Sequence, residues 1–181
     1  MSNDKKSHCQ SRRKKSAKTS SASSAKDNGM MTKVWGPAGW VFLHSCAMGY
    51  PIKIDKKNKD HRKRKRETKK FFESAGYVLP CRYCRESYNN FIKKLSIGRH
   101  LETRQSLCRW LYRIHNKVNK KLGVPRCEIP TFTNICKQYE TYRAQCTKTT
   151  TNERQERLEK GCTIPKDGVR KKCIIQIINA S

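Results

Sequence analysis

Residues 107–123 read LCRWLYRIHNKVNKKLG and decide the fold class of the chain. The large apolar residues in and just before this run recur at helical spacing and fall on one helix face: Leu107, Trp110, Leu111, Ile114, Val118 and Leu122. Gly123 and Pro125 end the helix, because glycine suits the position after a helix and proline cannot continue one. The stretch predicts a long amphipathic helix that packs against other helices.

Segments on both sides of this helix carry helical patterns as well. The first helix is expected to start at Gly36-Pro37, since proline is tolerated in a first turn, and to end at residues 49–51. Further helices are expected over residues 59–75 and 81–97, and residues 127–146 predict a turn plus a short helix. We therefore expect a small all-α bundle.

Charge and hydropathy divide the 181 residues into three parts. Residues 1–31 are predicted to be a disordered basic tail, because the first 30 hold eight Lys or Arg, two Asp and almost no large apolar residues. Residues 32–146 form the predicted folded domain, and 147–181 a C-terminal extension. No run of about 18 apolar residues occurs, so we expect no membrane span, and the N-terminus does not resemble a signal peptide.

The formal net charge of +28 predicts an anionic partner. Beyond the tail, residues 53–70 hold eleven Lys or Arg against three acids. Nucleic acid or an acidic protein is the expected partner of these two segments, and a solvated surface is the alternative.

Cys81 and Cys84 form a Cys-x-x-Cys pair directly after Pro80. On a helix these positions are neighbours within disulfide reach. A helix N-terminus favours a thiolate, and Arg82 and Arg85 add positive charge, so the pair is typical of redox chemistry. A zinc site needs about four ligands, and no second close pair is present, so we expect no metal. A structural disulfide remains the second alternative.

Two further helix faces combine aromatic residues with hydrogen-bonding groups. Trp40 and His44 share one face, and His115 and Asn119 share another. Single residues of this kind are usually core packing, but two such faces together are typical of a slot for a flat cofactor.

These motifs together resemble the Erv/ALR family of FAD-linked sulfhydryl oxidases. The resemblance rests on WGPAGWVFLH at residues 35–44, LPCRYCRES at 79–87 and HNKVNKKLG at 115–123, and it covers about residues 32–130. The Gly-Tyr-Pro after the first helix and the run around Cys81 look closest to members from large DNA viruses. The resemblance implies a four-helix bundle plus a short fifth helix, usually a homodimer, with non-covalent FAD. A viral setting would imply the host cytoplasm (virus factory) or the virion.

The resemblance also assigns roles to residues. Cys84 would be the cysteine next to the flavin, and Cys81 would exchange with the substrate dithiol, with O2 accepting the electrons as H2O2. The positions that would line FAD are Trp35, Gly36, Trp40, His44, Tyr50, His115, Asn116, Val118, Asn119 and Leu122. Tyr112 stands where the family commonly has a structural cysteine, so a displaced bridge between Cys108 and Cys127 is expected. Shuttle candidates are Cys162 with Cys173, or Cys136 with Cys146, and Cys9 could link two subunits.

The main alternative to an oxidase is a basic nucleic-acid-binding module whose cysteines bind zinc or stabilise the fold. Its charge supports it, but the basic segments lie away from the cysteine pair and no known nucleic-acid motif is present. A third hypothesis is an inactive structural virion component, which the intact Cys81–Cys84 pair disfavours.

Overall fold

The computed structural model describes residues 29–145 and 164–165, which fall into two compact units divided after Pro130. The first unit holds the helices α1 (Thr32–Met48), α2 (Lys59–Val78), α3 (Arg82–Lys94) and α4 (Arg104–Leu122), and the 3-10 helices η1 (Ile97–His100) and η2 (Arg126–Glu128). In the second unit the described residues form α5 (Phe132–Glu140) and the strands β1 (Ala144–Gln145) and β2 (Ile164–Pro165), which pair antiparallel.

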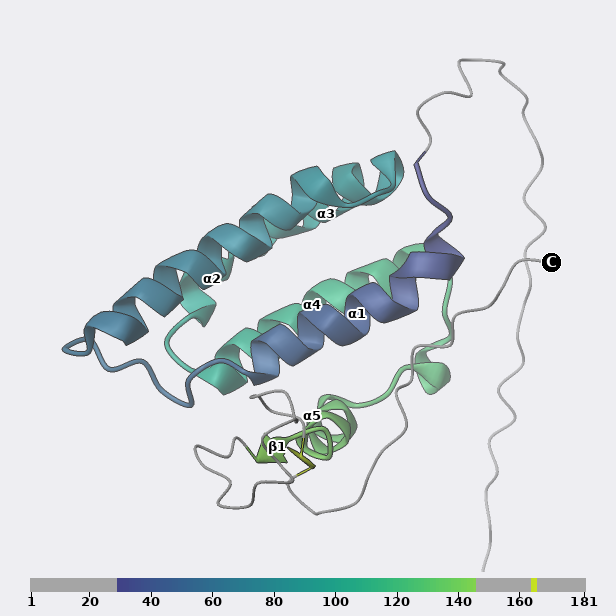
Figure 1. Ribbon diagram of the computed structural model, residues 1–181. Coiled ribbons are helices and arrows are strands. Elements are labelled where there is room, and N and C mark those ends of the chain that lie inside the picture. The colour runs from purple at the N-terminus through teal and green to yellow at the C-terminus, as the bar shows by residue number, and fades with distance from the viewer. Residues whose placement is uncertain (1–28, 146–163, 166–181) are drawn as a thin grey trace, which may run out of the picture. The chain divides into compact units, whose positions relative to one another are not determined.

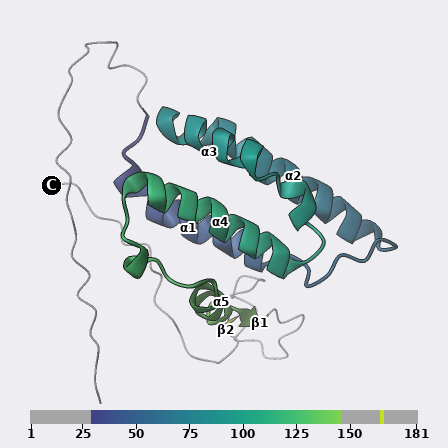
Figure 2. The same cartoon turned by 180° about the vertical axis from the view of Figure 1, so that it is seen from behind.

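The four long helices form a bundle in which α1 lies beside α4 and α2 beside α3 (Figures 1 and 2). The pairs are antiparallel: the Cys108 thiol near the start of α4 meets Met48 at the end of α1. The Asn89 amide of α3 likewise donates to the Gly76 carbonyl near the end of α2, at 3.0 Å. The predicted fold class, a four-helix bundle with a short fifth helix, is confirmed.

The best-packed part of the bundle surrounds Trp110, which is fully buried. Its indole N–H donates to the Leu95 carbonyl at 2.8 Å, and Phe72 packs edge-on against its ring, 5.4 Å between centroids. The Tyr88 hydroxyl donates to the Phe72 carbonyl at 2.8 Å. Most of the apolar face predicted on α4 is buried here, as expected because removing apolar side chains from water stabilises the fold.

The helix ends follow the local sequence, with one correction. Gly123 adopts φ 74° and closes α4, and its N–H reaches the carbonyls of Asn119 and Lys120. The predicted start of the first helix at Gly36-Pro37 is wrong, because α1 begins at Thr32 and Pro37 lies inside it. Proline at this depth removes one backbone hydrogen bond, and the remaining turns keep the helix continuous.

Several predictions fall outside the described residues: residues 1–28 of the predicted tail, Cys9, Cys146, Cys162 and Cys173. The last three residues of that tail, 29–31, are described, and they lie against Pro80 and Cys81. Within residues 29–145 and 164–165, no helix is long and apolar enough to cross a membrane.

Candidate functional site

The cysteine pair stands where α2 gives way to α3. Pro80 comes directly after Leu79, the C-cap of α2, and prevents that helix from continuing. Cys81 is then the N-cap of α3, with φ −127° and ψ 124°, and its Sγ accepts the backbone N–H of Cys84 at 3.4 Å. Both residues carry thiols in this structure. The pair is therefore a dithiol at a helix N-terminus, as the sequence predicted.

The two sulfurs have different surroundings. Cys81 is 8% exposed, whereas Cys84 is half-buried one turn into the helix. Burial, the hydrogen bond to Cys81 and the charge of Cys81, in that order of size, raise the pKa of Cys84 to about 11. The expectation of a stabilised thiolate is therefore wrong for Cys84 in the dithiol state. The N-terminal N–H of the helix points to the Cys81 sulfur instead, which is where the helix end favours negative charge.

Two cations oppose the effect of burial on the pKa of Cys84. Arg85 and Lys121 both lower its pKa through their charge. Lys121 reaches the site from the end of α4, where its Nζ donates to the Ser87 hydroxyl of α3. Arg85 is held by its bond to the Leu79 carbonyl at 2.8 Å. Sequence reasoning counted Arg85 but missed Lys121, which comes from a helix more than thirty positions away.

A second feature that sequence reasoning missed is a short segment ahead of α1. The Met30 N–H donates to the Pro80 carbonyl at 2.8 Å, and Gly29 forms an antiparallel bridge with Cys81. Gly29 has φ +74°, and a Cβ there would lie 1.9 Å from the Pro80 oxygen, so only glycine fits. The backbone of 29–31, which we call the N-terminal strap, thus lies against Cys81. Its one sequence signal is the Asn28-Gly29 turn pair.

The two predicted faces come together, with the rings of Trp40 and His115 against each other rather than on either side of a slot. The rings of Trp40 and His115 stack with centroids 3.8 Å apart and planes 9° from parallel. His44 Nε2 and His115 Nδ1 lie 3.2 Å apart, so one ring donates a hydrogen bond to the other. Trp40 stands eight residues beyond the start of α1, about 12 Å along the helix.

Both histidines are neutral near pH 7. Burial, and to a smaller extent the charge of His115, lower the pKa of His44 to about 4. Burial alone lowers the pKa of His115 to about 4. Neutral imidazoles offer one donor and one acceptor each, which suits hydrogen bonds to an uncharged heteroaromatic edge.

The other residues predicted to line a cofactor do not all lie beside Trp40, His44 and His115. The amides of Asn116 and Asn119 bond each other at 3.3 Å on α4, close to His115 in sequence. Trp35 donates to the Met30 carbonyl at 3.3 Å and so belongs with the strap. A Cβ on Gly36 would meet nothing within 4 Å, and Val118 is half-buried on α4.

Tyr50 and Leu122 lie at opposite ends of the bundle. Tyr50 is 1% exposed, and its hydroxyl donates to the Leu101 carbonyl at 2.9 Å, so the structure shows it as a core residue. Leu122 is 70% exposed at the end of α4.

The predicted bridge between Cys108 and Cys127 is wrong. Cys108 keeps its thiol, which donates to Met48 Sδ at 3.4 Å on the buried face of α4, whereas Cys127 is exposed and disulfide-bonded. Cys108 thus lies in the core of the bundle, whereas Cys127 lies at the surface. A hydrogen bond from the Tyr112 hydroxyl to the Pro130 carbonyl, at 2.9 Å, ties α4 to the segment after it.

In the described part of the chain, neither a metal-binding cluster nor the cavity around Trp110 coincides with the cysteine pair. Within the described part of the chain, no three His, Cys, Asp or Glu side chains gather closely enough to hold a metal ion. A cavity of about 190 Å³ lies around Phe72, Ile92 and Trp110, and none of the predicted site residues lines it.

The residues present fit a flat, anionic, heteroaromatic cofactor. Trp40 and His115 provide stacking planes, and His44, Asn116 and Asn119 provide neutral hydrogen-bonding groups. The same stretch of α4 carries Lys117, Lys120 and Lys121, whose charges suit phosphate groups.

Comparison with known proteins gives one consistent result. Residues 37–140 match the Erv1 / Alr family model, which is more than half of the chain. A probable FAD-linked sulfhydryl oxidase of Acanthamoeba polyphaga mimivirus is 37% identical over 95 residues, covering 52% of this chain and 62% of that protein. The mitochondrial FAD-linked sulfhydryl oxidase of Saccharomyces cerevisiae is 33% identical over 91 residues, covering 50% of this chain and 44% of that protein.

The solved structures agree with the sequence matches. The crystal structure of the yeast Erv1 core has a TM-score of 0.52 and 28% identity, and it covers 66% of this chain and 92% of that one. The match spans less than two thirds of each of the two sequence relatives named above. On the family match, the fold and the ordered motifs together, this chain belongs to the Erv1/Alr family.

Proposed function

We propose that this chain is a FAD-dependent thiol oxidase that forms disulfide bonds in protein dithiols. The observation that carries the proposal is the Cys81–Cys84 dithiol at the capped start of α3, flanked by Lys121 and Arg85. The names of the relatives, which are FAD-linked sulfhydryl oxidases, support the same activity. When bound, FAD would take the electron pair of the dithiol and deliver it to O2, giving hydrogen peroxide.

The chain's own residues account for the exchange with substrate. In the oxidised pair, a substrate thiolate attacks the Cys81 sulfur, the Cys81–Cys84 bond breaks, and its electron pair leaves on the Cys84 sulfur. The positive charges of Lys121 and Arg85 stabilise that sulfur as it gains charge. The second substrate thiolate then displaces Cys81, so the substrate loses two electrons and the pair gains them. Cys81 suits the exchanging role because its sulfur accepts a helix N-terminal N–H.

Cys84 suits the cofactor-facing role because Lys121, which acts on its charge, belongs to α4, the helix that also carries His115. Trp40, His44 and His115 would hold the flavin nucleotide by stacking and hydrogen bonds, and Lys117 and Lys120 of α4 would bind its phosphates.

A spectroscopic experiment tests this proposal. The purified full chain should carry flavin, and anaerobic dithiothreitol should bleach its visible absorption within the turnover time. Cys84→Ser should bind flavin but fail to bleach. Cys46→Ser is the matched control, because Cys46 is half-buried on α1 away from the pair and should bleach like the unmodified chain. A colourless protein, or bleaching that persists in Cys84→Ser, would contradict the proposal.

We also propose a homodimer formed over α1 and α2. Phe42 is 58% exposed and Phe71 39%, and their rings pack edge-on with centroids 6.1 Å apart, beside the 39% exposed Val41. Exposed apolar clusters of this kind are typical of subunit interfaces. Sedimentation should show a dimer that Phe42→Glu dissociates. A monomeric unmodified chain would contradict this part.

We further propose a viral setting for the protein, because two of its relatives come from Acanthamoeba polyphaga mimivirus and invertebrate iridescent virus 3.

Nucleic-acid binding is a second candidate function, carried by one observation on α2. Lys59, Lys63, Arg66 and Lys70 are exposed and recur every three or four positions, so they form one positive stripe. Glu67 pairs with two of them, at 2.9 and 3.5 Å. Binding to DNA or RNA should weaken steeply as the salt concentration rises, and Lys59→Glu/Lys63→Glu should weaken it further. Both results would support this function. Binding that is absent at low salt would contradict it.

A further inference from the structure

Large apolar side chains gather at the surface around the cysteine pair. Five of them are 60–77% exposed, and we call them the junction surface: Met30, Met31, Tyr77, Val78 and Tyr83. Monomeric proteins rarely leave so many large apolar residues together in water unless a partner covers them.

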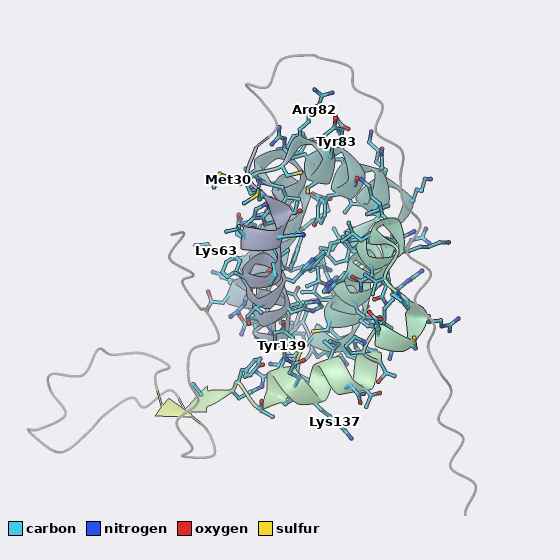
Figure 3. The ribbon with its side chains drawn as sticks, turned by 90° about the vertical axis from the view of Figure 1, so that its right-hand side faces the viewer. Met30, Lys63, Arg82, Tyr83, Lys137 and Tyr139 are labelled. Atoms are coloured by element: carbon cyan, nitrogen blue, oxygen red, sulfur yellow. The ribbon has the colours of Figure 1, made fainter. Side chains whose placement is uncertain are left out.

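The backbone brings these residues to the dithiol. Tyr77 and Val78 end α2 four and three positions before Cys81, and Tyr83 stands between the two cysteines. Met30 is held there by its bond to the Pro80 carbonyl. Figure 3 shows Met30 and Tyr83 at the same end of the bundle. A polypeptide whose thiol reaches Cys81 must therefore lie against this surface.

The charge at the same place is positive. Arg82 and Arg85 stand in the first turns of α3, and Lys121 comes from α4. Glu86, on the same helix, pairs with Arg82 at 3.1 Å. Two copies of this chain pairing over the junction surface would bring these cations together, so a carboxylate-bearing partner fits better than a second copy.

We propose that the junction surface binds the segment around the substrate thiol and selects cysteines flanked by an aromatic or large aliphatic residue and by a carboxylate. This rests on the proposed function, whose exchange step at Cys81 is unchanged. The apolar flank packs on Tyr77, Val78 and Tyr83, and the carboxylate faces Arg85 and Lys121. The strap backbone at Met30 borders the same binding surface.

Two dithiol peptides of equal length and cysteine spacing test the selection. One carries Phe and Glu beside each cysteine, and the other carries Gly and Lys. With the full chain, oxygen consumption should give a kcat/KM about tenfold higher for the first peptide, as expected for burial of one apolar side chain at the surface. Equal values for the two peptides, in a protein that oxidises dithiothreitol, would overturn the selection and leave the proposed function standing.

A pair of variants locates the effect. Tyr77→Ser/Val78→Ser should remove most of the preference by raising KM for the first peptide, while oxidation of dithiothreitol stays unchanged. Ile52→Ser is the matched control, because Ile52 is 75% exposed in the connection between α1 and α2 and should leave the preference intact. A preference that survives the double variant would overturn the assignment to this surface.

A binding readout keeps the test independent of turnover. The same peptides with serine in place of cysteine and a fluorescent label should bind the full chain with the same order of affinity. If the chain failed to oxidise dithiothreitol but still bound the Phe/Glu peptide, the proposed function would fall and the docking surface would stand. Absence of binding would overturn the docking surface itself.

Discussion

The two ends of the four-helix bundle are built differently. At one end Phe72, Trp110 and Leu101 are buried, and their polar neighbours are satisfied by backbone carbonyls. At the other end the dithiol is surrounded by exposed apolar residues and by cations from two helices. The residues that stabilise the fold and the residues that carry the proposed chemistry thus lie at different ends of the bundle axis. The buried end stabilises the packing of the helices. The exposed end can bind and release substrates while the bundle stays folded.

The largest expected effect is on the buried end. Trp110→Ala removes a fully buried side chain together with its bond to Leu95, and should lower the free energy of unfolding by about 3–5 kcal/mol. Val78→Ser at the open end should change it by roughly 0.5 kcal/mol or less. Urea unfolding followed by circular dichroism measures both. Equal losses would remove the distinction between the two ends.

The histidine cluster between the ends should make stability depend on pH. His44 and His115 have folded-state pKa values lowered to about 4, below the unfolded value of 6.5, so the unfolded chain binds their protons first. The free energy of unfolding that the neutral histidines contribute is fully present above pH 6.5. It is lost as pH falls towards 4, by about 1.4 kcal/mol per pH unit for each histidine. Urea midpoints across this range measure the slope. His44→Gln should flatten it, and an unchanged slope would show that the histidines are not the cause.

Release of the strap should have a smaller effect on stability and a clear one on reactivity. Gly29→Ala cannot keep φ +74° and the contact with the Pro80 carbonyl, so the strap should detach at a cost of roughly 1–3 kcal/mol. Cys81 should then be alkylated faster in the reduced protein, as mass spectrometry after brief iodoacetamide treatment would show. Gly98→Ala is the control, since a Cβ there meets only the Ser96 hydroxyl at 3.7 Å. An unchanged rate at Cys81 would show that the strap does not cover it.

The smallest expected effect concerns the start of α4 at the buried end. The Thr103 hydroxyl accepts the Ser106 N–H at 3.1 Å, and Thr103→Ala should cost about 1 kcal/mol. Thr131→Ala removes the equivalent cap of α5 and serves as a comparison in the other unit. Thermal unfolding of both variants measures the difference, and a loss above that of Trp110→Ala would contradict the ranking.

The sequence predicted what depends on local periodicity. The burial of Trp110 and Ile114 on α4, the end of that helix at Gly123 and the position of Cys81 at a helix start all follow from spacing and turn residues within one segment. The sequence predicted two faces that line a slot, one with Trp40 and His44 and one with His115 and Asn119, but it did not predict that the rings of Trp40 and His115 stack directly on each other.

What the sequence did not predict depends on contacts between distant segments. The strap residue Gly29 meets Cys81 through backbone groups that every residue carries, so no side-chain pattern marks the pairing. Lys121 looked like one of many lysines until α3 and α4 packed together. The thiol of Cys108 points to Met48, which helical spacing within α4 alone does not reveal.

The most direct test of the account is oxygen consumption by the full chain with dithiothreitol as the electron donor. Cys81→Ser and Cys84→Ser should each lose at least about a hundredfold in turnover, since neither can complete the disulfide. Cys46→Ser and Cys108→Ser should keep turnover near that of the unmodified chain. Full turnover in Cys84→Ser would show that electrons leave the protein by a route other than this pair.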